Sequence, residues 1–130
     1  MTSNFESDFD YGRINFHNAT EDEDKNKGID GFIGSIKVAT RRFRVPLSLY
    51  SAISIRKRFY TKSEFEKILA GTFEAVLYIF EYTDFFVICR VEDIATCLRQ
   101  KLFTEKPNRD GLTSGCYIQL GLLPYLSIPK

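Results

Sequence analysis

The sequence predicts a single α+β domain, built on a mostly antiparallel sheet with a central hairpin and two or three short helices. Two observations carry this prediction. Residues 72–91 hold two apolar runs rich in aromatic and β-branched side chains, which favour strands over helices. Capping signals on either side of this stretch, at Ser63 and at Glu92, predict short helices. With 130 residues, the chain is long enough to bury about two thirds of its unfolded surface.

The two apolar runs, residues 75–80 and 85–89, predict an antiparallel hairpin. Polar residues separate them, and Asp84 can close a turn by hydrogen bonding to its own backbone. In the first run both odd and even positions are apolar, so we expect a central strand that is covered on both faces. A single helix over residues 63–81 is the alternative, since the apolar positions also fit helical spacing. Gly71 favours the hairpin, because glycine is better suited to end a helix than to lie within one.

Before the hairpin, the pattern predicts strands at residues 31–38 and 42–49. The second alternates strictly between apolar and polar side chains, and Pro46 would place it at the edge of a sheet. Residues 47–59 fit both a helix and a strand. As a helix, this segment would end in a run of three cations that suits a helix C-terminus: Arg56, Lys57 and Arg58.

Two short helices are expected on either side of the hairpin. Ser63 opens a capping-box pattern, and the helix that follows should end at Gly71. A second helix is expected over residues 92–103. The polar residues 104–115 come next, and their length makes them a candidate binding loop. Residues 116–120 predict a last strand.

Charge divides the chain into three parts. Residues 1–30 carry eight acidic and three basic residues, residues 31–62 carry eight basic and no acidic ones, and the remainder has nine acidic and seven basic residues. The formal net charge of +1 therefore conceals a dipolar molecule. We expect residues 1–30 to form an acidic N-terminal arm, ordered at most in part, and residues 31–130 to form the α+β domain. The arm either lies on the basic segment or leaves it open to a charged partner.

The most distinctive candidate site is the basic segment of residues 37–62, in which aromatic side chains are interleaved with cations. Such a surface can bind phosphates and stack bases, or can dock onto an acidic protein. The structural alternative is a solvated strand face and a helix end, neutralised by the acidic arm. The candidate partner- or nucleic-acid-binding residues are Arg41, Arg42, Arg44, Arg56, Lys57, Arg58, Phe59 and Tyr60.

The sequence shows no catalytic or metal-binding pattern. His17 is the only histidine and lies in the acidic arm, so any nucleophile activated by imidazole would depend on it. Three cysteines without CxxC spacing, Cys89, Cys97 and Cys116, are expected to be buried, inert thiols in a reducing compartment. The acids of residues 21–24 lack the alternating spacing of a calcium loop. We therefore expect no enzyme, no cofactor and no metal.

The acidic start of the chain does not resemble a signal peptide, and no apolar run is long enough to span a bilayer. We therefore expect a cytoplasmic protein that does not contact membranes. Segregated charge and an excess of aromatic residues, 12 Phe and 7 Tyr, are typical of a protein-binding module. We expect a stoichiometric inhibitor that occludes its partner's functional site, such as a toxin-neutralising immunity protein (an antitoxin) or an inhibitor of a host enzyme. The acidic arm would then imitate nucleic-acid phosphates. Nucleic-acid binding through residues 37–62 is the alternative, and a homodimer stays open.

Overall fold

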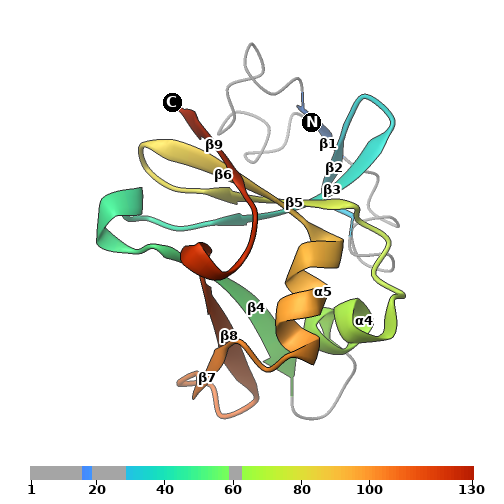
Figure 1. Ribbon diagram of the computed structural model, residues 1–130, viewed down its shortest axis with the longest axis vertical. Helices are drawn as coiled ribbons and strands as arrows, with labels where there is room; N and C mark the ends of the chain where they lie inside the picture. Colours follow the sequence, from blue (N-terminus) through green and yellow to red (C-terminus); the bar gives the residue numbers. More distant parts are fainter. Residues whose placement is uncertain (1–15, 19–28, 59–62) are drawn as a thin grey trace.

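The computed structural model describes residues 16–18, 29–58 and 63–130, which form two β-sheets and two α-helices (Figure 1). The large sheet has the strand order β1 (Phe16–Asn18), β2 (Gly31–Ile33), β3 (Ile36–Arg42), β5 (Leu77–Glu81), β6 (Phe85–Arg90) and β9 (Leu126–Pro129). The small sheet has the order β4 (Ala52–Arg58), β8 (Thr113–Gln119) and β7 (Thr104–Pro107). The helices α4 (Glu64–Ala70) and α5 (Val91–Arg99) lie side by side near the small sheet (Figure 1). Apart from the parallel pair β3–β5, the strand pairs of both sheets are antiparallel, so the predicted α+β class is confirmed.

The predicted hairpin is formed by β5 and β6 at the centre of the large sheet. Tyr78 lies opposite Cys89, and the backbone N–H of Tyr82 donates to the carbonyl of Phe85 in the turn at 2.8 Å. The alternative helix over residues 63–81 is not formed, because α4 ends at Ala70. Gly71 adopts the left-handed conformation there, with φ of 75°, which a glycine tolerates without a steric penalty.

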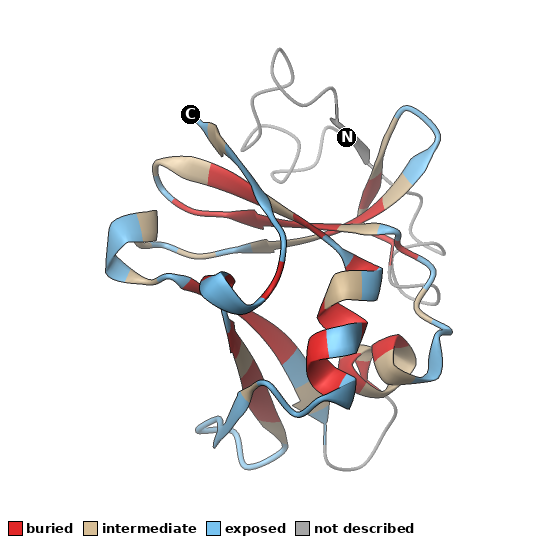
Figure 2. Cartoon of the chain, in the orientation of Figure 1, coloured by how far each residue is buried: buried red, intermediate tan, exposed pale blue. Residues whose placement is uncertain are grey.

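Both faces of β5 are buried, as its apolar pattern predicts (Figure 2). Tyr78 and Phe80 point into the main core, which the two sheets and two helices enclose. Ile79 points the other way, into a smaller cluster with Val38 and Phe86 on the outer face of the large sheet. The strand period of two therefore separates one apolar run into two clusters.

Residues 31–38 form a hairpin rather than the single predicted strand. β2 pairs with β3 so that Gly31 lies opposite Val38, and Gly34 occupies the turn with φ of 60°. A positive φ suits glycine, so Gly34 can close the turn between two strands that the sequence pattern predicts as one.

The predicted edge strand over residues 42–49 is wrong, because β3 ends at its start and a 3₁₀ helix, η1 (Leu47–Leu49), occupies its end. Between them the chain stays extended: the N–H of Phe43 donates to the carbonyl of Glu81 at 2.7 Å. Pro46 has no N–H to continue this pairing and stands at the N-cap of η1. The alternation arises because Phe43 and Val45 pack against the main core.

Residues 47–59, which fitted a helix and a strand, mainly form strand β4. Its residues Ile53 and Ile55 both enter the main core at strand spacing. The three cations that would suit a helix end therefore lie on a strand instead: Arg56, Lys57 and Arg58.

The C-terminal third departs from prediction in two places. The helix predicted over residues 92–103 ends at Arg99, and Lys101 beyond it has a positive φ of 59°. Residues 104–115 are not a plain loop but contain β7, a turn and the start of β8. β8 continues to Gln119 and so covers most of the strand predicted at residues 116–120. A second 3₁₀ helix, η2 (Leu120–Leu122), then leads toward β9.

Part of the predicted acidic arm belongs to the fold. β1 pairs with β2 at one edge of the large sheet, and Ile29 is fully buried. The rest of the arm, residues 1–15 and 19–28, lies outside the described residues, as does the predicted contact between the arm and the basic segment. No helix of the described residues is long and apolar enough to cross a membrane.

Candidate functional site

Arg41 lies in a partly buried cluster with Glu64 and Tyr78, where β3, β5 and α4 meet. Its Nη2 atom is 2.5 Å from Glu64 Oε1 and 3.2 Å from Tyr78 Oη, and the Tyr78 hydroxyl donates to Glu64 Oε2 at 2.9 Å. The Arg41 and Glu64 side chains are 22% and 17% exposed. Burial opposes the charge of Arg41, but the contacts with Tyr78 and Glu64 outweigh it and raise its pKa. Arg41 is therefore charged, and it connects β3 with α4 and β5 within the fold.

Arg42 and Arg44 lie apart from this cluster. Adjacent residues on a strand point to opposite faces, so Arg42 leaves the Arg41 side and its Nε atom lies 3.4 Å from Glu81 Oε1. Glu81 is 4% exposed and also pairs with the ammonium group of Lys130. Arg44 is exposed on the segment that follows β3.

The cations of β4 also separate. The side chain of Lys57 pairs with Glu105 at 3.2 Å and lies 4.9 Å from the centre of the Phe65 ring, beside the main core. Arg56 and Arg58 are exposed on the opposite face of the same strand. Phe59 and Tyr60, the aromatic members of the predicted site, lie outside the described residues.

Glu64 connects Arg41 with the backbone of Arg56. The Oε1 atom of Glu64 accepts hydrogen bonds from Arg41 Nη2, at 2.5 Å, and from the backbone N–H of Arg56, at 2.7 Å. The basic segment is therefore divided among several environments instead of forming one patch. Acids from later in the chain form ion pairs with cations of this segment: Glu64, Glu74, Glu81 and Glu105. Asp30 of the acidic arm also favours the charge of Arg41.

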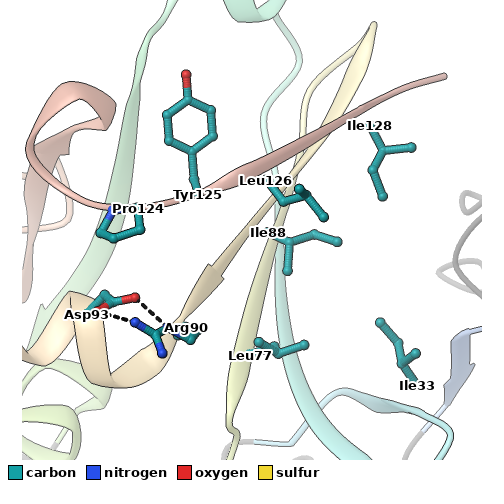
Figure 3. A pocket seen from close by; sticks show the side chains of 9 residues that line it. All are labelled: Ile33, Leu77, Ile88, Arg90, Asp93, Pro124, Tyr125, Leu126 and Ile128. Atoms are coloured by element: carbon teal, nitrogen blue, oxygen red, sulfur yellow. Dashed lines mark hydrogen bonds and ion pairs between the residues drawn. The ribbon is translucent and has the colours of Figure 1, made fainter.

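A second candidate site is an apolar groove on the outer face of the large sheet (Figure 3). It has a volume of about 450 Å³, and side chains from four strands line it. An ion pair between Arg90 and Asp93, at 2.8 Å, lies at one end. Leu126 of β9 is 60% exposed and Tyr125 before it is 46% exposed. The apolar strand residues of the groove are Ile33, Leu77, Ile88, Leu126 and Ile128.

The sequence reasoning missed this groove. The apolar residues of β5 predicted burial on both faces, but nothing in them showed that the outer side would stay partly open. Residues 126–129 form the edge strand β9, although Pro124 precedes it and Pro129 ends it, and proline has no N–H for strand pairing. The alternation of Leu126, Ser127 and Ile128 is the signal that could have indicated this strand.

The thiols are buried, as the sequence predicts. Cys89, Cys97 and Cys116 are free and at most 3% exposed. Burial raises the pKa of Cys89 and of Cys116 to about 12, and that of Cys97 above its ordinary value. The described residues contain no group of three or more His, Cys, Asp or Glu side chains placed to hold a metal ion. The side chain of His17 is outside what the structure describes.

Comparison with known proteins adds no relative to this picture. No family model matches the chain, and neither a curated protein nor a solved structure does.

Proposed function

We propose that this chain is a non-enzymatic protein-binding module that acts as a stoichiometric inhibitor or immunity-type protein, covering a functional site of its partner. The observation that carries the proposal is the apolar groove beside β9. Exposed apolar surface of this kind, bounded by polar residues, is typical of protein-interaction sites. The proposed partner is a protein that presents an extended segment with apolar side chains.

The position of β9 supports this mode of binding. β9 is the last strand of the large sheet and pairs with β6, with Leu126 opposite Ile88. An edge strand carries backbone groups that a further strand can pair with, while pockets beneath it select side chains. Leu126 and Ile128 lie two residues apart, so both contribute to the groove next to that edge. A partner segment can therefore gain backbone hydrogen bonds and apolar contacts together.

Charged side chains at one end of the groove can orient a bound partner. Arg90 forms ion pairs with Glu92, at 2.9 Å, and Asp93, at 2.8 Å, and its side chain is 58% exposed. Exposed pairs of this kind contribute little to stability but can guide an approaching charged partner. By contrast, Arg41, Arg42 and Lys57 of the basic segment already have acidic partners within the domain. They support the fold more than they offer a docking surface.

The test is affinity capture from lysate with the wild-type chain and two charged variants. In Leu126→Glu a charge enters the groove at a residue that is 60% exposed, so the fold should persist. Leu112→Glu is the matched control, because Leu112 is 55% exposed but lies in the turn between β7 and β8. A protein recovered in near-equal amount by the wild type and by Leu112→Glu, lost with Leu126→Glu and insensitive to nuclease, is the expected result. Equal capture by Leu126→Glu, or no protein above background, would contradict the proposal.

A further inference from the structure

The outer face of the small sheet gathers cations around one aromatic ring. Paired residues of antiparallel strands share a face, and Arg56, Gly115 and Lys106 lie opposite one another across β4, β8 and β7. Tyr117 and Arg58 share this face because each lies two residues from a member of that row. Their neighbours Ile55 and Cys116 point the other way, into the main core. We call the surface made by Arg56, Arg58, Lys106 and Tyr117 the basic face.

The ring of Tyr117 has a fixed place on the basic face. A Cβ atom at Gly115 would lie 2.7 Å from Tyr117 Oη and 2.8 Å from its Cζ, so the phenol end of the ring covers the bare backbone of that glycine. The Tyr50 ring packs edge-on against Tyr117, with 6.3 Å between ring centres. The Nζ atom of Lys106 lies 5.8 Å from the ring centre, within cation–π distance. A partly buried aromatic ring is thus held against the sheet with a cation beside it.

The charges on this face have one sign. The strand residues that share it are Ala52, Ser54, Arg56, Arg58, Thr104, Lys106, Thr113, Gly115, Tyr117 and Gln119, with no acid among them. Arg56, Arg58 and Lys106 are exposed, and none of the ion pairs within the described residues involves them. The acid of β7, Glu105, points inward to Lys57 and Ser114.

The turn between β7 and β8 holds an acid, Asp110, whose charge interacts with Arg56. Its carboxylate accepts hydrogen bonds from the backbone N–H groups of Leu112, at 2.9 Å, and Thr113, at 3.0 Å, and from the Thr113 hydroxyl at 2.8 Å. These bonds lower the pKa of Asp110 and hold the carboxylate in the turn. Asp110 therefore stabilises the turn, and none of the ion pairs within the described residues joins it to the cations of the strands.

We propose that the basic face binds single-stranded nucleic acid, with Arg56, Arg58 and Lys106 on phosphates and Tyr117 stacked on a base. Cations that follow a backbone, combined with an aromatic ring for base stacking, are how proteins hold single strands without reading sequence. A paired base has both of its faces stacked within the duplex, so the ring favours an unpaired strand. The face lies on the small sheet, and it is independent of the groove on the large sheet.

The test is fluorescence anisotropy of a labelled 15-nucleotide oligothymidine, and of a duplex of equal length, with the purified full chain over a range of salt concentrations. Three phosphate contacts predict a slope of log K against log salt of about −2, at roughly −0.7 for each contact on a single strand. The double variant Arg56→Ala with Arg58→Ala should reduce this slope to about −0.7. Arg99→Ala, at an exposed cation on α5, is the matched control and should leave the slope unchanged.

Tyrosine variants test the stacking step separately. Tyr117→Leu should weaken binding about tenfold with an unchanged salt slope, since it removes stacking and no charge. Tyr117→Phe keeps the ring and should bind as the wild type does. Arg56 and Arg58 are exposed, so their variants fold and can decide the question even if Tyr117→Leu does not fold. The proposal is overturned if the wild type fails to bind at low salt, if Arg99→Ala loses as much as the double variant, or if the duplex binds more tightly than the single strand.

Discussion

The Arg41–Glu64–Tyr78 cluster permits a quantitative prediction about stability. In the variant Glu64→Gln the side chain keeps its size and an oxygen that can accept the Arg56 N–H, but it loses the charge that balances Arg41. Exposed ion pairs contribute about 0–1 kcal/mol, whereas breaking a buried pair costs about 3–5 kcal/mol. The Arg41 and Glu64 side chains are 22% and 17% exposed, so the pair is closer to the buried case. We expect the free energy of unfolding to fall by about 3 kcal/mol.

Urea unfolding followed by far-ultraviolet circular dichroism measures this change, because the chain contains no Trp for fluorescence. With a slope m of about 1.5 kcal/mol per molar urea, the midpoint should fall by about 2 M while m is unchanged. The matched control is Glu74→Gln, which breaks the Lys37–Glu74 pair, at 3.4 Å and with both side chains more than 40% exposed. This control should lower the free energy of unfolding by less than about 0.5 kcal/mol. Equal midpoints for the two variants would refute the reasoning that burial makes the Arg41 pair important.

Three further predictions concern the core, a helix end and the contact between the sheets. The thiols of Cys89, Cys97 and Cys116 should not react with Ellman's reagent in the native protein at pH 8, and all three should react in urea. A thiol that reacts at once in the native state would contradict their burial and raised pKa values. Gly71→Ala should lower the free energy of unfolding by about 1 kcal/mol, since φ is 75° there. Gly121→Ala is the control and should change the free energy of unfolding little, because its Cβ meets nothing within 4 Å. Similar effects of the two variants would argue against the left-handed helix end. Tyr82→Phe should cost about 1–2 kcal/mol in urea unfolding, because the buried Tyr82 hydroxyl donates to the Ala52 carbonyl at 2.6 Å, and an unchanged midpoint would mean that water replaces this bond.

The elements that the sequence predicts correctly are those with local signals. Helix α4 is capped at its start by Ser63, whose N–H donates to Glu66 Oε1 at 2.8 Å, and at its end by Gly71 in the left-handed conformation. Both signals lie within a few residues of the helix they define. The central hairpin likewise joins neighbouring runs through a turn of few residues. Segment 42–49 fails because its alternation comes from packing beside the turn of β5 and β6, which is distant in sequence.

The cations of the candidate site are separated for a related reason. A run such as Arg56, Lys57, Arg58 suggests one cluster of charge, and at a helix end these side chains would lie near one another. On a strand the middle residue points to the opposite face, so Lys57 lies beside the core while Arg56 and Arg58 face out. The same holds for Arg41 and Arg42 on β3. Whether consecutive cations form one surface depends on the secondary structure. The sequence pattern of residues 47–59 fits both a helix and a strand, so it does not predict which surface forms.

Glu64 connects the internal ion pair with the outer surface. Its carboxylate contacts Arg41 of β3, Tyr78 of β5 and the backbone N–H of Arg56 on β4, so one helix residue fixes strands of both sheets. Apolar contacts alone allow packed sheets to shift, whereas hydrogen bonds to a charged group are directional and are lost on small displacements. The backbone N–H that donates to Glu64 belongs to Arg56, and the side chain of Arg56 lies on the basic face. The acids of the later chain therefore act on the basic segment in two ways: they neutralise Arg41, Arg42 and Lys57, and they fix the strand from which Arg56 and Arg58 point into solvent.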